Sequence, residues 1–403
     1  MIPSLKNYEK IVGKDAIEQL KSSSERLVGC HISHVNATSQ GGGVAEILNT
    51  LVILMNRLKI DTSWRVFKGS NHFFNITKKI HNGMQGDESV KMTAFRKRVY
   101  LEETERNCIM NHFKTEDFVI IHDPQPAAMI MHHEKRQPWV WRCHIDITNA
   151  NPLIWDFLRP YVNRYDGVIL SIEEYLKPDI TPPHHIIRPT IDPISIKNAP
   201  IKEDKRKKVL SKRGIDIDRP IMCQISRFDP WKDPMGVYRM WEQVRKENDC
   251  QLVLMGDMAA DDPEGPVLYE KVREQVGEKK DVHLITERND VLVNCLQTDS
   301  DVIIQNSVRE GFGLTVSEAL WKGTPVVSTP VGGIPQQIVD GKNGFLVRNV
   351  DEGAKRCLEL IRNPDLARKM GESGREHVRN NFLITRHVQD YINLSNHYIK
   401  KVQ

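Results

Sequence analysis

Short apolar runs rich in β-branched residues alternate along this chain with longer stretches in which apolar residues recur at helical spacing. This alternation is typical of parallel β-sheets whose strands are joined by crossover helices. The runs that predict strands are 30–36, 62–67, 118–123, 139–146, 167–171, 221–226, 251–256, 282–286, 301–307 and 325–329. The pattern therefore predicts an α/β protein with one doubly wound sheet in each half of the chain.

A proline-bearing and highly charged segment separates the two halves. It runs from His184 to Lys208, "HHIIRPTIDPISIKNAPIKEDKRKK", and has no convincing periodicity, so we expect an interdomain linker with a boundary near Pro200. The chain then divides into a domain of residues 1–200 and a domain of residues 201–383, each long enough to bury its own core. In such sheets ligands bind outside the carboxyl ends of the strands.

Charge and cysteine content limit the kinds of ligand and the cellular compartment that we expect for this protein. Lys and Arg number 57 against 53 Asp and Glu, an excess too small and too dispersed to indicate nucleic-acid binding. The seven cysteines stand singly, with no C-x-x-C pair, which favours a reducing compartment. No N-terminal leader pattern and no apolar run near the ~20 residues that span a bilayer are present. We expect a cytoplasmic protein that binds small molecules and no membrane.

The run "SVREGFGLTVSEALWKG", residues 307–323, predicts a turn between a buried strand and a helix. Gly311 and Gly313 allow the backbone to approach a ligand closely, and a helix that begins near Leu314 or Thr315 offers unpaired N–H groups to an anion. The run therefore outlines a phosphate site.

Two carboxylates, Glu310 and Glu318, flank this turn. Carboxylates are poor ligands for phosphate but good acceptors for sugar hydroxyl groups, so a phosphate between two hydroxyl-bearing rings is the simplest occupant. A sugar nucleotide has this layout. The alternative is a plain glycine turn with Glu318 capping the helix or facing solvent.

A second strand end supplies cations. The run "QISRFDPWKDP" places Arg227 and Lys232 between a strand and a helix that Pro234 could begin. Arginine can form paired bonds with a diphosphate, and lysine can act on it as a point charge. The alternative is an arginine and a lysine in surface ion pairs.

Three consecutive glycines, Gly41 to Gly43, lie between the first predicted strand and its helix. Because Glu46 occupies the place of the last glycine, the dinucleotide fingerprint G-x-G-x-x-G is broken, which argues against a nicotinamide dehydrogenase. The loop still suits close approach to a ligand, although a flexible turn would look the same.

Two other strand ends carry polar residues, His122 with Asp123 and Arg142 with His144 and Asp146. A carboxylate and an imidazole on neighbouring strands could bind hydroxyl groups or handle a proton. For any one of them, a hydrogen-bonded histidine or a turn-forming aspartate remains the alternative. The D-x-D pairs at 216/218 and 299/301 do not follow strand ends, so we expect no built-in metal.

Taken together, these motifs resemble the retaining glycosyltransferases of family 4, which have the GT-B fold of two Rossmann-like domains facing each other across a cleft. The motifs are "EGFGLTVSEA" at 310–319, "SRFDPWK" at 226–232 and "VGGIPQQIVDGKNGFLV" at 331–347. The resemblance covers essentially the whole chain. It implies that a helix within 384–403 crosses back to the first domain. A non-catalytic sugar-binding protein is the weaker interpretation, because the sequence shows no export signal and carries cations suited to a diphosphate.

Within that family, "HVNATSQGGGVAEIL", "HDPQPAAMI" and "WVWRCHIDI" are similar to the trehalose glycosyltransferring synthases of archaea and bacteria. Those enzymes join a nucleoside-diphosphate glucose (UDP-, ADP- or GDP-glucose) to free glucose, or run the reverse. Related trehalose phosphorylases, which use glucose 1-phosphate, share some of these runs and remain an alternative, as does a family 4 enzyme with another sugar acceptor.

The resemblance also implies residue roles. Arg227 and Lys232 would hold the donor diphosphate, and Glu310 would bind the donor glucose. Glu318 would hold the ribose. The remaining donor-binding residues implied are His144, Gly311, Phe312, Gly313, Leu314 and Thr315, and those on the acceptor side are Gly41, Gly42, Gly43, His81, Asn82 and Asp123.

The family retains anomeric configuration, by a proposed front-face attack. Its members are often dimers, so a homodimer is an expectation that no stretch of this sequence tests. Stimulation by Mg²⁺ without a dedicated site is compatible with the resemblance.

Overall fold

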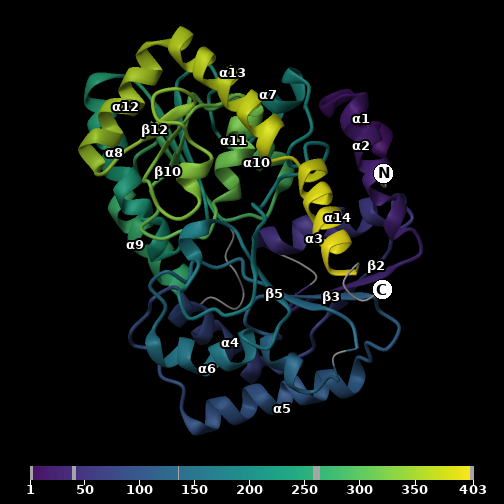
Figure 1. Cartoon of the computed structure of the whole chain (residues 1–403). Coiled ribbons are helices and arrows are strands. Elements are labelled where there is room, and N and C mark those ends of the chain that lie inside the picture. Colours follow the sequence, from purple (N-terminus) through teal and green to yellow (C-terminus); the bar gives the residue numbers. More distant parts are fainter. Residues whose placement is uncertain (1–2, 39–41, 135, 257–263, 400–403) are drawn as a thin grey trace. The chain divides into compact units, whose positions relative to one another are not determined.

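The structure is a computed structural model that describes residues 3–38, 42–134, 136–256 and 264–399. It separates into two compact units, one of residues 1–190 with 384–403 and one of residues 191–383 (Figure 1). Each unit contains a six-stranded sheet in which every pair of neighbouring strands is parallel. The α/β prediction is confirmed.

The first sheet has the strand order β2-β1-β3-β4-β5-β6. Its strands are β1 (His31–Asn36), β2 (Asp61–Val66), β3 (Phe118–His122), β4 (Trp139–Arg142), β5 (Gly167–Leu170) and β6 (His184–Ile186). The central strands β3, β4 and β5 are buried along their whole length, because helices cover both faces of the sheet. Each run that predicts a strand in this half contains one.

Helices of the first unit form two layers around this sheet (Figure 1). They are α1 (Leu5–Val12), α2 (Lys14–Ser24), α3 (Gly42–Arg57), α4 (Asn71–Met84), α5 (Ala94–Met110), α6 (Pro152–Val162) and α14 (Ile384–Ile399), with short 3₁₀ turns at Glu25–Leu27, Ala127–Met131 and Glu173–Tyr175. One layer contains α4, α5 and α6, and the other contains α2, α3 and α14.

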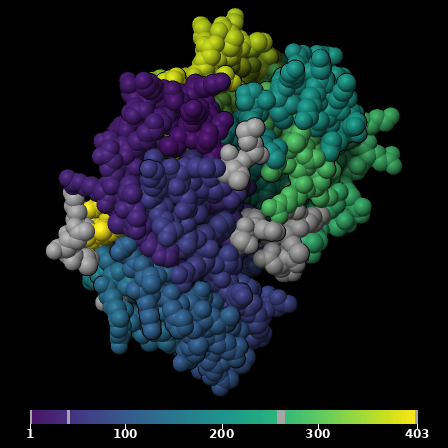
Figure 2. Space-filling view, turned by 90° about the vertical axis from the view of Figure 1, so that its right-hand side faces the viewer, coloured from purple at the N-terminus to yellow at the C-terminus, as the bar shows by residue number. Residues whose placement is uncertain are grey.

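Helix α14 belongs to the first unit although it follows the second in the chain. It packs against α2, α3 and β3, and the space-filling view shows its yellow atoms among purple and blue ones (Figure 2). The Tyr398 ring stacks on that of Phe118 with centroids 5.4 Å apart, and the Tyr391 ring meets that of His34 edge-on at 5.4 Å. The aromatic face of α14 therefore completes the core of the first unit.

The second sheet has the order β12-β11-β10-β7-β8-β9. Its strands are β7 (Ile221–Ile225), β8 (Gln251–Met255), β9 (Val282–Ile285), β10 (Val302–Gln305), β11 (Val326–Ser328) and β12 (Gly344–Leu346). Its helices are α7 (Glu203–Ser211), α8 (Pro234–Glu247), α9 (Glu264–Val276), α10 (Asp290–Asp299), α11 (Leu314–Lys322), α12 (Val350–Arg362) and α13 (Pro364–Asn381), with 3₁₀ turns at Pro230–Lys232 and Ile334–Gln336. The expected starts of α8 at Pro234 and of α11 at Leu314 are confirmed.

The segment interpreted as a structureless linker contains two elements, so that interpretation was wrong in part. Strand β6 has three residues at the sheet edge, too short for a periodic signal. Helix α7 buries only Leu210, because its remaining positions are mostly charged. Residues 191–200 pack with the second unit, where Asn294 Nδ2 donates to the carbonyl oxygens of Ile196 and Ala199 at 2.9 and 2.8 Å.

Within the described residues, no helix is both long and apolar enough to cross a membrane.

Candidate functional site

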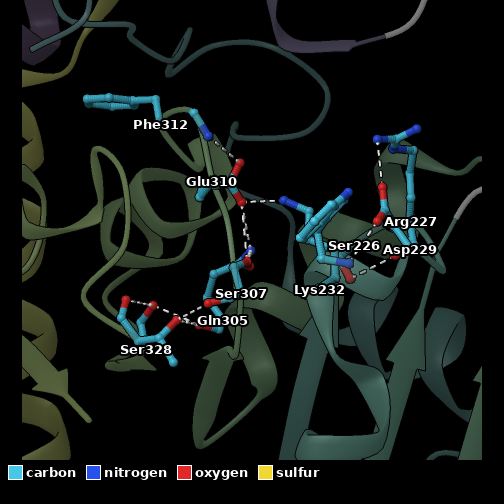
Figure 3. A network of polar contacts seen from close by, with 12 residues as sticks. Ser226, Arg227, Asp229, Lys232, Gln305, Ser307, Glu310, Phe312 and Ser328 are labelled. Atoms are coloured by element: carbon cyan, nitrogen blue, oxygen red, sulfur yellow. Dashed lines mark hydrogen bonds and ion pairs between the residues drawn. The ribbon is translucent and has the colours of Figure 1, made fainter. Parts of the chain in front are cut away.

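The carboxyl edge of the second sheet brings the two predicted cations beside carboxylates (Figure 3). Lys232 ends the 3₁₀ turn after β7, and its Nζ contacts Glu310 Oε2. Arg227 lies between β7 and that turn, and its Nη2 is 3.1 Å from Asp229 Oδ2. The Arg227 side chain is 49% exposed, whereas that of Lys232 is 16% exposed. Arg227 is therefore the more accessible cation, and Lys232 the more enclosed one.

Local bonds fix the turn that carries both cations. Asp229 Oδ1 accepts a hydrogen bond from the backbone N–H of Trp231 at 2.9 Å, and Gln224 Nε2 donates to the carbonyl of Lys232 at 2.8 Å. Asp233, with a left-handed φ of 40°, then caps α8 by accepting from Gly236 N at 2.8 Å. The "DPWKD" run thus holds Lys232 in place by its own turn chemistry.

Glu310 lies in the turn between β10 and α11, and β10 neighbours β7 in the sheet. The Glu310 carboxylate is the centre of a polar network (Figure 3). Besides Lys232, Oε2 accepts from Gln305 Nε2 at 3.1 Å and lies 3.4 Å from Ser307 Oγ. Oε1 accepts from the backbone N–H of Gly311 at 3.2 Å. A carboxylate held by four donors is fixed in orientation, as a group that reads sugar hydroxyls must be.

The turn "GFG" leads from Glu310 into α11. Gly313 has φ of +80°, a conformation that glycine adopts without strain, and it forms the N-cap of α11 with no side-chain cap. Phe312 is buried, and a Cβ on Gly333 would meet its ring at 2.4 Å. The first N–H groups of α11, which begins with Leu314 and Thr315, are therefore positioned for an anion.

Glu318 lies in the middle of α11 and does not face open solvent, because its side chain is 6% exposed. Gln297 Nε2 donates to its Oε2 at 3.1 Å, and Lys197 Nζ lies 3.5 Å from Oε1. Lys322 Nζ bonds to Asn198, Gln297 and the Glu318 carbonyl, and burial lowers the pKa of this lysine to about 8. Glu318 and Glu310 are thus held by separate groups of donors.

The carboxyl edge of the first sheet gathers a different set of groups. Asp123, directly after β3, has a left-handed φ of 63°, and its Oδ1 accepts from the backbone N–H of His144 at 2.8 Å. Burial raises the pKa of Asp123 to about 6, although the His144 bond and the Arg142 charge oppose this shift. The carboxyl group is therefore poised to change protonation state near neutral pH.

Three histidines form a hydrogen-bonded row at this edge. His34 Nδ1 is 3.0 Å from His122 Nε2, and His122 Nδ1 is 3.0 Å from His144 Nε2. Burial holds the pKa of all three imidazoles below the ordinary value, and the positive charge of Arg142 lowers the pKa of His122 and His144 further. Burial therefore favours the neutral form of all three rings.

The predicted acceptor residues lie on other elements of the first unit. Gly41 is outside the described residues, while Gly42 and Gly43 begin α3, with Gly42 at φ of +76°. His81 and Asn82 are half-buried in the last turn of α4. Within the described ranges, no cluster of three or more His, Cys, Asp or Glu side chains is arranged to hold a metal ion.

Sequence reasoning missed several partners of the predicted residues: Lys197, Asp229, Gln297 and Gln305 in the second unit, and His34 in the first. Lys197, Gln297 and His34 meet their partners through the fold, from separate parts of the sequence. Lys197 lies in the segment interpreted as a linker, and His34, at the start of the run "HVNATSQGGGVAEIL", contacts a histidine of another strand. Asp229, two residues from Arg227, is the one that spacing alone could have identified.

Comparison with known proteins places both units among described families. Residues 34–177 match the family "Trehalose synthase, N-terminal domain", and residues 205–377 match "Glycosyl transferases group 1". The chain is 45% identical over 399 residues to a trehalose synthase of Thermococcus litoralis, covering 98% of this chain and 97% of that protein.

Two more distant similarities concern one relative in sequence and one solved structure. A trehalose phosphorylase of Grifola frondosa is 27% identical over 94% of this chain but 59% of its own length. A solved structure of sucrose-phosphate synthase from Thermosynechococcus elongatus superposes with a TM-score of 0.73 at 15% identity, covering 92% of this chain and all of that one. At that identity the likeness concerns the fold alone.

Proposed function

Because this chain belongs to the trehalose synthase family of the group 1 glycosyltransferases and has the GT-B fold, we propose that it forms trehalose from a nucleoside-diphosphate glucose and free glucose, or cleaves it in reverse. Membership of this family makes the chain a hexosyltransferase that acts in trehalose chemistry. The donor, the retaining course and the residue roles are the proposal.

The observation that carries the proposal is the contact between Lys232 and Glu310 at the carboxyl edge of the second sheet. One group is suited to a phosphate oxygen and the other to a sugar hydroxyl, and the two touch. A sugar phosphate has these two features on neighbouring atoms. Arg227, on the exposed side of Lys232, extends the cationic surface to a second phosphate.

In the proposed reaction the bond between the donor glucose and the diphosphate breaks, and a hydroxyl of the acceptor glucose forms the new bond. Its proton passes to the departing phosphate oxygen. Negative charge grows on the diphosphate, and Arg227, Lys232 and the N-terminus of α11 stabilise it more than they stabilise the bound donor. Since trehalose is α,α-linked and the donor is an α-glucoside, one transfer retains configuration.

In this proposal these cations and backbone amides balance the diphosphate charge without a resident metal. Glu310 orients the glucose by accepting from its hydroxyls, and Glu318 accepts from the ribose. Asp123 faces the acceptor. These roles are proposed from the position and chemical type of each residue, and each can be tested by substituting that residue.

A product assay tests the function. The purified protein is incubated with glucose and either UDP-, ADP- or GDP-glucose or glucose 1-phosphate, and trehalose is detected. We expect trehalose from at least one nucleotide donor and none from glucose 1-phosphate. Trehalose from glucose 1-phosphate alone would make the protein a phosphorylase, and no trehalose from any donor would overturn the proposal.

A further inference from the structure

The histidine row rises along the first sheet from its middle to its carboxyl edge. In the parallel register His34 of β1 pairs with Ile120, two residues before His122 at the end of β3. His144 lies two residues beyond the end of β4, and β1, β3 and β4 are consecutive neighbours in the sheet. The row thus joins a fully buried imidazole to a half-buried one at the strand ends.

Neutrality constrains the direction of the hydrogen bonds. A neutral imidazole has one N–H and one lone pair, and each gap in the row has one hydrogen bond. The three N–H groups must therefore all point the same way. Either they point toward His144, which then has its proton on Nδ1, or they point toward His34, which then has its proton on Nε2.

The inner end of the row decides between the two directions. Within the described residues, His34 Nε2 is buried and has no hydrogen-bond partner. A buried N–H without an acceptor is rarer in proteins than an acceptor without a donor, so Nε2 is better occupied by a lone pair. His34 then donates from Nδ1 to His122, and His122 donates from Nδ1 to His144 Nε2.

The charges around the row favour the neutral state. Arg142 is fully buried and donates to the Leu170 carbonyl at 2.8 Å and to Ser171 Oγ at 3.3 Å. Within the described residues it forms no direct ion pair, although the carboxyl groups of Asp123 and Asp390 act on its charge. A proton added to His122 or His144 would face this cation. The carboxyl group of Asp123 accepts from the His144 backbone N–H and not from a ring.

We propose that His34 and His122 are positioning residues that hold His144 as the neutral tautomer with its proton on Nδ1. His144 then presents an N–H donor at the carboxyl edge of the first sheet, to a hydroxyl oxygen of the transferred sugar. The identity of that ligand rests on the proposed function, whereas the tautomer does not. A free neutral histidine in water prefers the proton on Nε2, so the row imposes the less common form on His144.

The tautomer is measured directly by ¹⁵N NMR of protein labelled at histidine, with the His144 signals assigned from His144→Gln. We expect a protonated Nδ1 and an unprotonated Nε2 on His144 in the wild-type protein. In His122→Phe, which keeps a ring but removes both hydrogen bonds, we expect the Nε2–H form to become the major one. A wild-type His144 protonated on Nε2, or no change in His122→Phe, would overturn the proposal.

Kinetics separate positioning from folding. His122→Phe should lower kcat/KM for the sugar-nucleotide donor about tenfold, the effect of one lost hydrogen bond. It should leave unchanged the Kd of the free nucleoside diphosphate, which lacks the transferred glucose. Equal losses in both would show a general structural defect and would contradict the proposal. If no donor is turned over, the proposed function fails while the NMR result stands on its own.

Two further variants sharpen the test. His34→Asn keeps a side-chain N–H near the position of Nδ1 and should preserve the His144 tautomer and kcat/KM better than His34→Leu, while equal effects would count against a relay. His133→Phe is the matched control. His133 is a half-buried histidine of the same unit with aromatic neighbours, and it lies outside the row. It should change neither the tautomer nor the kinetics.

Discussion

The two sheets have the same parallel architecture, yet their carboxyl edges handle charge in opposite ways. At the second edge, Lys232 and Arg227 each contact a carboxylate. At the first edge, burial lowers the pKa of three imidazoles and raises the pKa of a buried carboxyl group, Asp123, to about 6. The second edge thus carries ion pairs, whereas burial at the first edge works against charge on its side chains.

Replacing one of the two basic residues at the second edge should have the largest effect on activity. Lys232→Ala should lower turnover of the sugar-nucleotide donor by on the order of a hundredfold or more, because charge on the leaving diphosphate loses a stabilising partner. Arg227→Ala should act in the same direction. Steady-state kinetics measures both, with Lys246→Ala on the exposed face of α8 as the control. Unchanged turnover in both site variants would remove the diphosphate role.

Removing the buried acid at the other edge should stabilise the protein. Asp123 has a raised pKa in the fold, so the folded state binds more protons than the unfolded state between about pH 4 and 6. Stability therefore falls as pH rises through that window, and the full cost is present above the folded pKa. Asp123→Asn should raise the free energy of unfolding by on the order of 2 kcal/mol near pH 7.

Urea unfolding from pH 5 to 7.5 measures this effect. The gain from Asp123→Asn should be larger at pH 7.5 than at pH 5, and the asparagine can keep the bond to His144 N. Asp61→Asn, at an exposed strand position, should show no such trend. A gain that does not depend on pH would mean that burial does not perturb Asp123. Activity should fall in the variant if this residue faces the acceptor.

The smallest expected effect concerns the buried carboxylate of α11. Glu318→Gln should raise KM for a nucleotide donor about tenfold and leave kcat nearly unchanged, because it weakens acceptance from the ribose and not from the reacting sugar. Gln297 and Lys197 keep a polar partner at the position. An unchanged KM would indicate that Glu318 serves only to bond Lys197 and Gln297 and does not bind the ribose.

Much of the fold could be predicted from the sequence, and the strands and helix that were not predicted share a cause. The strand runs were found because buried parallel strands need continuous apolar residues. β12 lies in "GFLV", which was noted as a motif but not as a strand, and β6 was missed for the same reason: each has three residues at a sheet edge. Helix α7 was missed because a charged, solvated helix has almost no apolar stripe.

In the site, too, motifs identify single residues, whereas their contacts depend on the fold. Lys232 and Glu310 were named from motifs at strand ends, but their contact depends on β7 and β10 being neighbours, which only the fold establishes. His34 begins the run "HVNATSQGGGVAEIL", but nothing in that run indicates which residue it contacts. Its place in the histidine row follows from the strand order β1-β3-β4, which no local pattern specifies.

The return of α14 to the first unit has a consequence for biosynthesis. Tyr391 and Tyr398, which complete the first core against His34 and Phe118, are translated after every residue of the second unit. On the ribosome the second unit can fold as soon as it emerges, whereas the first waits with part of its apolar surface uncovered. During that interval we expect the nascent first unit to expose the aromatic surface that α14 later covers.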